Sequence, residues 1–117
     1  RALADALRRL RIRPRVAVVG VAADKDVHAI ARALRGVVAR VIAVAARTHR
    51  SRPAVETARA FRGAGLRASS APTVAAGVLA AHAVVGANGT VLVTGSHFVV
   101  GEAVAFLEQR QYLTISQ

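Results

Sequence analysis

The sequence has no cysteine, no methionine and no tryptophan among its 117 residues. Without cysteine, neither a disulfide nor a thiolate metal site can form. Aromatic residues are also scarce, because three phenylalanines and one tyrosine are all that could stack on a nucleic-acid base. No apolar run approaches the roughly 20 residues that a membrane-spanning helix needs. These absences favour a globular, cytoplasmic domain with no membrane partner.

The N-terminal stretch RALADALRRLRIRPR is rich in arginine and amphipathic, with Leu3, Leu7 and Leu10 at helical spacing until Pro14 interrupts the pattern. It lacks the continuous apolar core of a secretory signal, and it does not begin with methionine. We therefore expect a segment of a longer protein. The length suits a single domain, 1–117, with a hydrophobic core of its own.

The formal net charge of +11 makes nucleic-acid binding one alternative. Sixteen of the seventeen basic residues are arginine, and alanine and valine are abundant, a composition that GC-rich coding produces without any function. A basic binding module would need the densest cluster of arginines on one exposed face: Arg8, Arg9, Arg11, Arg13 and Arg15. The scarcity of stacking residues disfavours this alternative.

Apolar residues alternate between two periods along the chain. Short runs, most of them apolar enough to be buried on both faces, predict strands at 16–19, 41–45, 66–69 and 91–94. The segments between them carry apolar stripes at helical spacing, and Asp24 or Asp26 can cap the first of these helices. Strands that alternate with helices predict an α/β fold, a Rossmann-like three-layer domain with a mostly parallel sheet and helices on both faces.

The C-terminal part has its own pattern. A helix carrying Val100, Val104 and Leu107 follows the fourth strand, and alternating residues at 112–116 predict an edge strand. His82, at the flank of the preceding helix's apolar stripe, is expected to be a half-buried packing residue.

Ligands of open parallel sheets gather outside the carboxyl ends of the strands. Four polar segments follow the four expected strands in turn: GVAADKD, ARTHRSR, SSAPT and GSHF. Apart from His82, the polar residues that could carry chemistry fall in these segments. The sequence therefore predicts an anion-handling site at this edge of the sheet.

The segment TGSHFVVGE runs from Thr94 to Glu102 and is not a Walker A loop. Gly95 and Gly101 enclose five residues instead of four, and glutamate stands where that motif requires lysine. GVAADKD likewise does not satisfy the dinucleotide pattern G-x-G-x-x-G. A helix beginning at Ser96 could hold a carboxylate or phosphate on its free N–H groups, or this serine could be only a helix cap.

Two further groups could bind an anionic substrate. Asp24, Lys25 and Asp26 could orient a substrate or touch a hydrated Mg²⁺ ion, or they could simply cap a helix with a local ion pair. Arg50 lies in a loop with three other basic residues, and its guanidinium suits carboxylate or phosphate, although an ordinary basic loop is equally possible. No catalytic triad and no metal-ligand set can be assembled from the spacing.

Four stretches, VAVVGVAADKDVHAIARAL, RTHRSRPAVETARAF, APTVAAGVLAA and VLVTGSHFVVGEAVAFL, carry a family resemblance. In this order they are similar to the C-terminal domain of folylpolyglutamate synthase/dihydrofolate synthase, a branch of the Mur ligase family. The last stretch is the most specific, because the family ends with a strand, Gly-Ser, an apolar or aromatic pair and Val-Gly-Glu. There are two departures. Where the family usually has Pro-Arg-Ala-Leu, this chain has His49-Arg50-Ser51-Arg52, and only Arg50 matches. Where the family commonly has Leu-Tyr after Gly-Ser, this chain has His97-Phe98.

The resemblance implies part of an ATP-dependent ligase that phosphorylates a carboxylate of dihydropteroate or folate, after which the amine of L-glutamate attacks the acyl phosphate. ATP and Mg²⁺ would be bound mainly by a central ATPase domain that this chain lacks, and the chain would close the cleft over glutamate and ATP. Alone it is expected to be inactive and monomeric, with the rest of its own ligase as partner. The residues expected at the substrate and ATP cleft, none of them catalytic, are Asp24, Lys25, Asp26, Arg50, Ser96 and His97.

Two other readings stay open. Another Mur-type ligase, acting on a cell-wall precursor, would keep the family and change the substrate, although the TGSHFVVGE ending and the lack of long inserted loops favour the folate branch. A structural domain whose loops are only caps and turns would bind nothing at this edge. The segment does not specify whether the parent enzyme makes dihydrofolate, extends a polyglutamate tail, or does both.

Overall fold

Strands and helices alternate along the chain in the computed structural model, which describes residues 5, 9, 15–86 and 89–116. The four predicted strands are confirmed to within two residues at each end. In chain order the elements are β1 (Val16–Gly20), α2 (Val27–Leu34), β2 (Arg40–Ala43), α3 (Ala54–Gly63), β3 (Arg67–Ser70), α4 (Val74–Val85), β4 (Val91–Gly95) and α5 (His97–Ser116).

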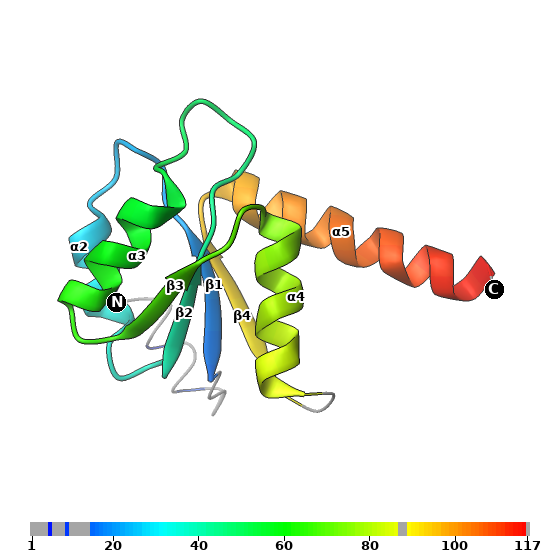
Figure 1. Ribbon diagram of the computed structural model, residues 1–117, viewed down its shortest axis with the longest axis horizontal. Coiled ribbons are helices and arrows are strands. Elements are labelled where there is room, and N and C mark those ends of the chain that lie inside the picture. The colour runs from blue at the N-terminus through cyan, green and yellow to red at the C-terminus, as the bar shows by residue number, and fades with distance from the viewer. Residues whose placement is uncertain (1–4, 6–8, 10–14, 87–88, 117) are drawn as a thin grey trace.

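The strands form one parallel sheet in the order β3-β2-β1-β4 (Figure 1). The central strand is β1, in which Val18 pairs with Ile42 on one side and with Val93 on the other. Because all four strands run in one direction, their carboxyl ends meet at a single edge of the sheet, the upper edge in Figure 1.

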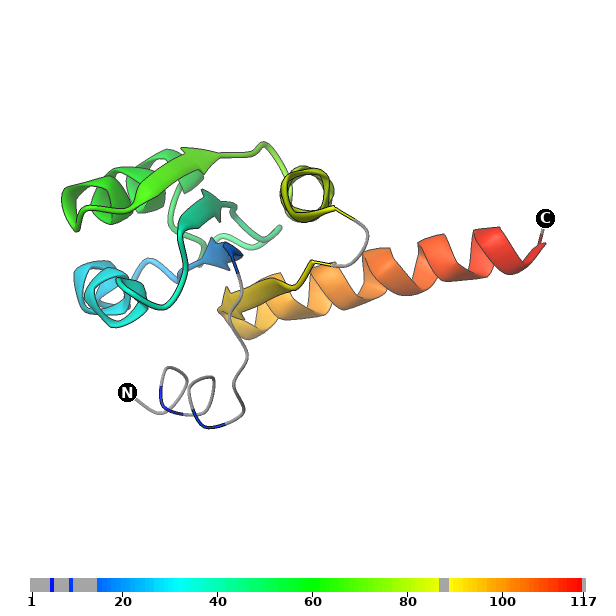
Figure 2. The ribbon, with the colours of Figure 1, turned by 90° about the horizontal axis from the view of Figure 1, so that it is seen from below.

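Two helical layers cover the two faces of the sheet, as predicted. Successive side chains of a strand point to opposite faces, so Ala17 and Val19 of β1 pack with α2 and α3, whereas Val16 and Val18 pack with α4 and α5. Figure 2 shows the sheet between these two pairs of helices. All five residues of β1 are buried, which explains its continuous apolar run.

Short polar signals fix where the helices begin and end. The carboxylate of Asp26 accepts the backbone N–H of Ala29 (3.0 Å) at the start of α2, which confirms one of its two expected caps. The hydroxyl of Thr73 accepts the backbone N–H of Ala76 (3.0 Å) at the start of α4. That helix ends at Gly86, which has φ +79°.

The expected edge strand at 112–116 is wrong, because α5 stays helical to Ser116. Five alternating residues are a short pattern, and the preceding Glu-Gln-Arg-Gln favours a helix with no glycine or proline to stop it. The helix extends well beyond the sheet in both views (Figures 1 and 2).

The apolar residues of α5 lie on two faces. Val99 and Ala103 are buried against the sheet and α4. The predicted stripe of Val100, Val104 and Leu107 is instead exposed, at 38%, 48% and 49%.

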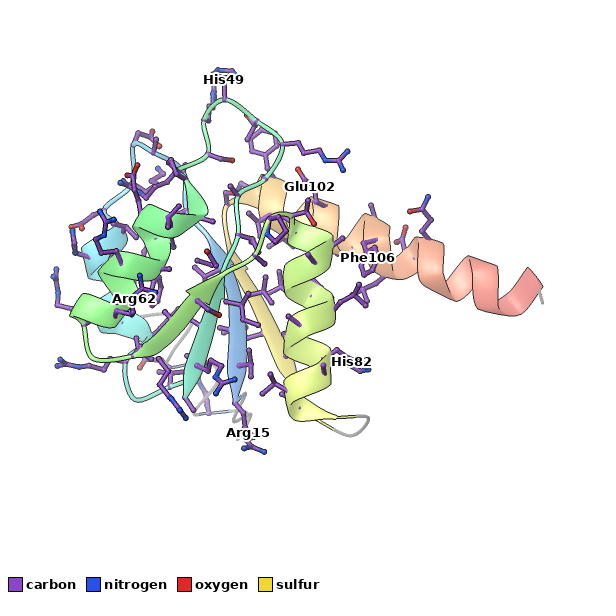
Figure 3. All side chains as sticks on the ribbon, viewed as in Figure 1. Arg15, His49, Arg62, His82, Glu102 and Phe106 are labelled. Carbon is purple, nitrogen blue, oxygen red and sulfur yellow. The ribbon has the colours of Figure 1, made fainter. Side chains whose placement is uncertain are left out.

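Two other expectations concern exposure. His82 is exposed on α4 rather than half-buried, so it is not a packing residue (Figure 3). Most of the amphipathic N-terminal stretch, with its leucines at helical spacing, and most of the arginine cluster lie outside the described residues. Of that cluster Arg9 and Arg15 are described, and both are exposed.

Candidate functional site

Three of the four polar segments meet in one cavity at the carboxyl edge of the sheet. The loops after β1, β2 and β4 enclose a volume of about 680 Å³ that is open to solvent. The fourth segment, SSAPT, does not line it. The lining residues are Val21, Ala22, Ala23, Asp24, Lys25, Ile30, Thr48, His49, Arg50, Ser51, Gly95, Ser96, His97 and Phe98.

Five of the six predicted cleft residues therefore lie together. Asp24 and Lys25 come from the β1 loop, Arg50 from the β2 loop, and Ser96 and His97 from the start of α5. The ionised groups of Lys25 and Arg50 outnumber the one carboxylate of the lining, so the cavity suits an anion. Figure 3 shows the neighbouring His49 at the outer end of the β2 loop.

The sixth predicted residue, Asp26, does not line the cavity. Its carboxylate is the N-cap of α2, and the hydrogen bond from the backbone N–H of Ala29 holds the pKa of Asp26 below its ordinary value, with a further contribution from the positive charge of Arg32. The Asp-Lys-Asp stretch thus divides into two cavity residues and one helix cap.

The β1 and β2 loops are tied together by backbone hydrogen bonds. Ala22 and Ser51 form an antiparallel bridge. Beside it, the N–H of Ala23 donates to the carbonyl of Arg50 (2.8 Å), and the N–H of Arg52 donates to the carbonyl of Val21 (3.0 Å). This pairing brings Lys25 and Arg50 to the same cavity although they are far apart in sequence.

The guanidinium of Arg52 reinforces that junction. Its Nη2 donates to the carbonyl oxygens of Ala23 and Lys25, both at 2.9 Å. Its Nη1 lies 3.6 Å from a carboxylate oxygen of Glu56 on α3. The side chain is only 19% exposed, and its hydrogen bonds hold the loop that carries Lys25 in place.

The turn from β4 into α5 forms the third wall. Gly95 has φ +119°, and the N–H of Ser96 donates to the carbonyl of Gly20 (2.9 Å). The hydroxyl of Ser96 accepts the N–H of Val99 (3.2 Å), so this serine caps α5. The cap leaves other N–H groups of the first turn facing the cavity end of the helix, where they favour an anion.

Sequence reasoning missed one polar contact that shapes the site. The carboxylate of Glu102 on α5 accepts the backbone N–H of Arg47 (2.6 Å), fifty-five residues away in the chain. It fastens the β2 loop, which carries His49 and Arg50, to α5 (Figure 3). In the sequence, Glu102 stood out only as the last residue of the Val-Gly-Glu stretch that contributes to the family resemblance, and that stretch did not indicate a contact with the β2 loop.

Two absences hold for the part of the chain that the structure describes. No three histidine, cysteine or acidic side chains come together as a metal site there. No helix in the same part is both long and apolar enough to cross a bilayer.

Residues 1–97 match the family model described as "Mur ligase, glutamate ligase domain". Among solved structures, Escherichia coli FolC in complex with DHPP and ADP shares 26% sequence identity over 94% of the chain, with a TM-score of 0.81. Mycobacterium tuberculosis folylpolyglutamate synthase complexed with ADP shares 26% identity over 91% of the chain, with a TM-score of 0.74. The bifunctional folylpolyglutamate synthase/dihydrofolate synthase of Yersinia pestis, 21% identical over 92% of the chain with a TM-score of 0.74, shares the fold.

In each of these three structures the matched region is 26% of the other chain's length, so the present chain spans about a quarter of them. No curated protein sequence matches the chain.

Proposed function

The chain belongs to the Mur ligase family as a glutamate ligase domain, and from this premise we propose that it is the C-terminal domain of a cytoplasmic, ATP-dependent ligase that joins L-glutamate to dihydropteroate or folate. The likeness to E. coli FolC and to the M. tuberculosis folylpolyglutamate synthase supports this substrate class. The chain, 1–117, makes one domain, and the ATPase domain belongs to the remaining three quarters of such a ligase.

The cavity at the carboxyl edge carries this proposal. Glutamate, folate and ATP are all anionic, and Lys25, Arg50 and the N-terminus of α5 come from the three loops that line the cavity. ATP supplies the phosphoryl group that activates the substrate carboxylate before the amine of glutamate displaces phosphate and forms the amide. Closure of this domain over the cleft of the ligase would exclude water from the activated carboxylate.

The residues of the cavity fit a phosphate or carboxylate better than a metal ion. Asp24 is the one carboxylate of the lining. A Y. pestis homologue is complexed with AMPPNP and a manganese ion, and we place the corresponding Mg²⁺ mainly on the parts of the ligase outside this chain. The proposal gives Lys25 and Arg50 the role of holding anionic groups, and gives Ser96 the role of fixing the start of α5.

The test is an assay of the whole ligase that contains this domain. ATP consumption should require both L-glutamate and a pteroate or folate. Lys25→Ala should reduce kcat/KM at least about tenfold, because a charge-assisted contact to an anion is lost. Arg15→Ala, at the opposite edge of the sheet (Figure 3), is the matched control and should leave turnover unchanged.

Ser96 needs a pair of variants because it also caps α5. Ser96→Thr keeps a capping hydroxyl and should retain most of the ligase activity. Ser96→Ala removes the hydroxyl and should lose activity. Turnover that depends on a cell-wall precursor instead of folate would move the chain to another branch of the family. DNA binding with a steep salt dependence, and no ligase activity in the parent protein, would overturn the proposal.

A further inference from the structure

A second cavity lies between α2 and α3, on one helical layer of the molecule. It encloses about 560 Å³ and shares no lining residue with the first cavity. Arg32 lies in α2 and Arg35 is the residue that caps its C-terminal end. On the other side, Arg59 lies in α3 and Arg52 in the loop just before that helix. We call this cavity the α2–α3 groove.

The charge of the α2–α3 groove is strongly one-sided. Four guanidinium groups and the imidazole of His28 line it with one carboxylate, that of Glu56, and the carboxylate of Asp26, outside the lining, offsets part of the charge of Arg32. One ion pair in this groove joins Arg52 to Glu56. Among the described residues, the side chains of Arg32, Arg35 and Arg59 form no ion pair. The Nε–H of Arg52 is buried and has no hydrogen-bond partner among the described residues. Donors therefore greatly outnumber acceptors here.

Small residues of α3 and its C-terminal cap leave space for a ligand in the groove. Ala60, Gly63 and Ala64 line it, and a methyl group built on Gly63 would meet no atom within 4 Å. No phenylalanine, tyrosine or tryptophan lines the groove, and the imidazole of His28 is the one ring in its lining, so the groove offers little surface on which a nucleobase could stack. The space and the donors together fit a small, non-aromatic anion.

We propose that the α2–α3 groove binds a small multivalent anion that carries two or more carboxylate or phosphate groups. The planar fork of arginine pairs with either group through two parallel N–H···O bonds. Arginines on the two sides of the groove can bind two such groups of one molecule at once. A monatomic anion such as chloride can contact only one side, so it should bind more weakly. This site goes beyond the proposed ligase function and does not depend on it.

The test is an NMR titration of the ¹⁵N-labelled chain at low ionic strength, with two separate probes, inorganic tripolyphosphate and triglutamate. Saturable shifts of the backbone amides of α2 and α3 are expected with at least one of them. The tighter probe identifies the source of the anion as phosphate or carboxylate. If neither probe binds, or if the shifts gather in the first cavity or scatter over the surface, the proposal is wrong.

Matched variants separate a site from general attraction to a basic protein. Gly63→Glu places a carboxylate in the groove and should weaken binding about tenfold or more, whereas Gly63→Gln, of the same size without the charge, should stay within about threefold of the unmodified chain. Arg59→Glu should weaken binding of the anion as much as Gly63→Glu does. Arg15→Glu makes the same charge change outside both cavities and should have little effect, and an equal loss there would overturn the proposal. Thermal unfolding of each variant shows whether it is folded.

Discussion

Gly20 and Gly95 are paired at the ends of β1 and β4 with no room for a side chain between them. A Cβ atom added to Gly95 would overlap the carbonyl oxygen of Gly20, and the same carbonyl accepts the N–H of Ser96 (2.9 Å). Gly95 also has φ +119°, a conformation that side chains disfavour. The start of α5, and with it one wall of the first cavity, depends on this contact.

Gly95→Ala should therefore lower the free energy of unfolding by about 2 kcal/mol or more, through backbone strain and steric overlap. Gly101→Ala is the matched control, because Gly101 lies within α5 and an added Cβ there meets nothing within 4 Å. That change should stabilise the chain by about 0.5–1 kcal/mol through helix propensity. Urea unfolding of both variants measures the difference, and equal effects would contradict the close approach.

Arg52→Ala should loosen the loop that carries Lys25, because two hydrogen bonds from one guanidinium to Ala23 and Lys25 are lost. The expected loss of stability is about 1–3 kcal/mol, with faster hydrogen exchange at the amides of this loop. Arg62→Ala is the control. It removes a hydrogen bond from an arginine of α3 to the carbonyl of Ala68 in β3 (2.9 Å), and should leave exchange in the β1 loop unchanged.

Glu102→Ala should free the β2 loop from α5, since the acceptor for the N–H of Arg47 is removed. Hydrogen exchange at the amide of Arg47 should accelerate, and stability should fall by about 1 kcal/mol. Glu102→Gln keeps a carbonyl acceptor of the same length and should retain much of the protection. If the two variants exchange alike at Arg47, the contact does not hold the loop.

The sequence predicts the fold well because its strands and caps are local signals. The apolar run of β1 and the aspartate before α2 each determine their element through nearby residues alone. Parallel strands then bring their loops to one edge whatever the details of packing, so Lys25, Arg50 and Ser96 could be grouped without a structure.

What could not be predicted depends on contacts between distant segments. The bond from Arg47 to Glu102 and the brace from Arg52 to the β1 loop join residues more than twenty positions apart, and no spacing rule identifies such pairs. The prediction that the stripe of Val100, Val104 and Leu107 is the apolar face of α5 that packs inward is wrong for a related reason. Both Val99 and Val100 belong to apolar sets at helical spacing, and only the position of the sheet decides between them.

Asp26 should make stability depend on pH in the acid range. Its pKa is lowered in the folded chain, chiefly by the N–H of Ala29. The stabilisation is therefore fully present above the unfolded pKa, near 3.8, and is lost as the pH falls through the lower folded value. Asp26→Asn keeps a capping oxygen and removes the titration, so its unfolding temperature should fall less steeply with acid. An unchanged slope between pH 5 and about 2 would contradict this.

The two faces of α5 can be distinguished by neighbouring valines. Val99→Ala removes two methyl groups from a side chain that is 1% exposed, and should cost about 1–3 kcal/mol. Val100→Ala, at 38% exposure, should change stability by no more than about 0.5 kcal/mol. Both changes gain the same helix propensity, so the difference between their unfolding free energies reports burial alone. A larger loss at Val100 would mean that α5 packs through its other face.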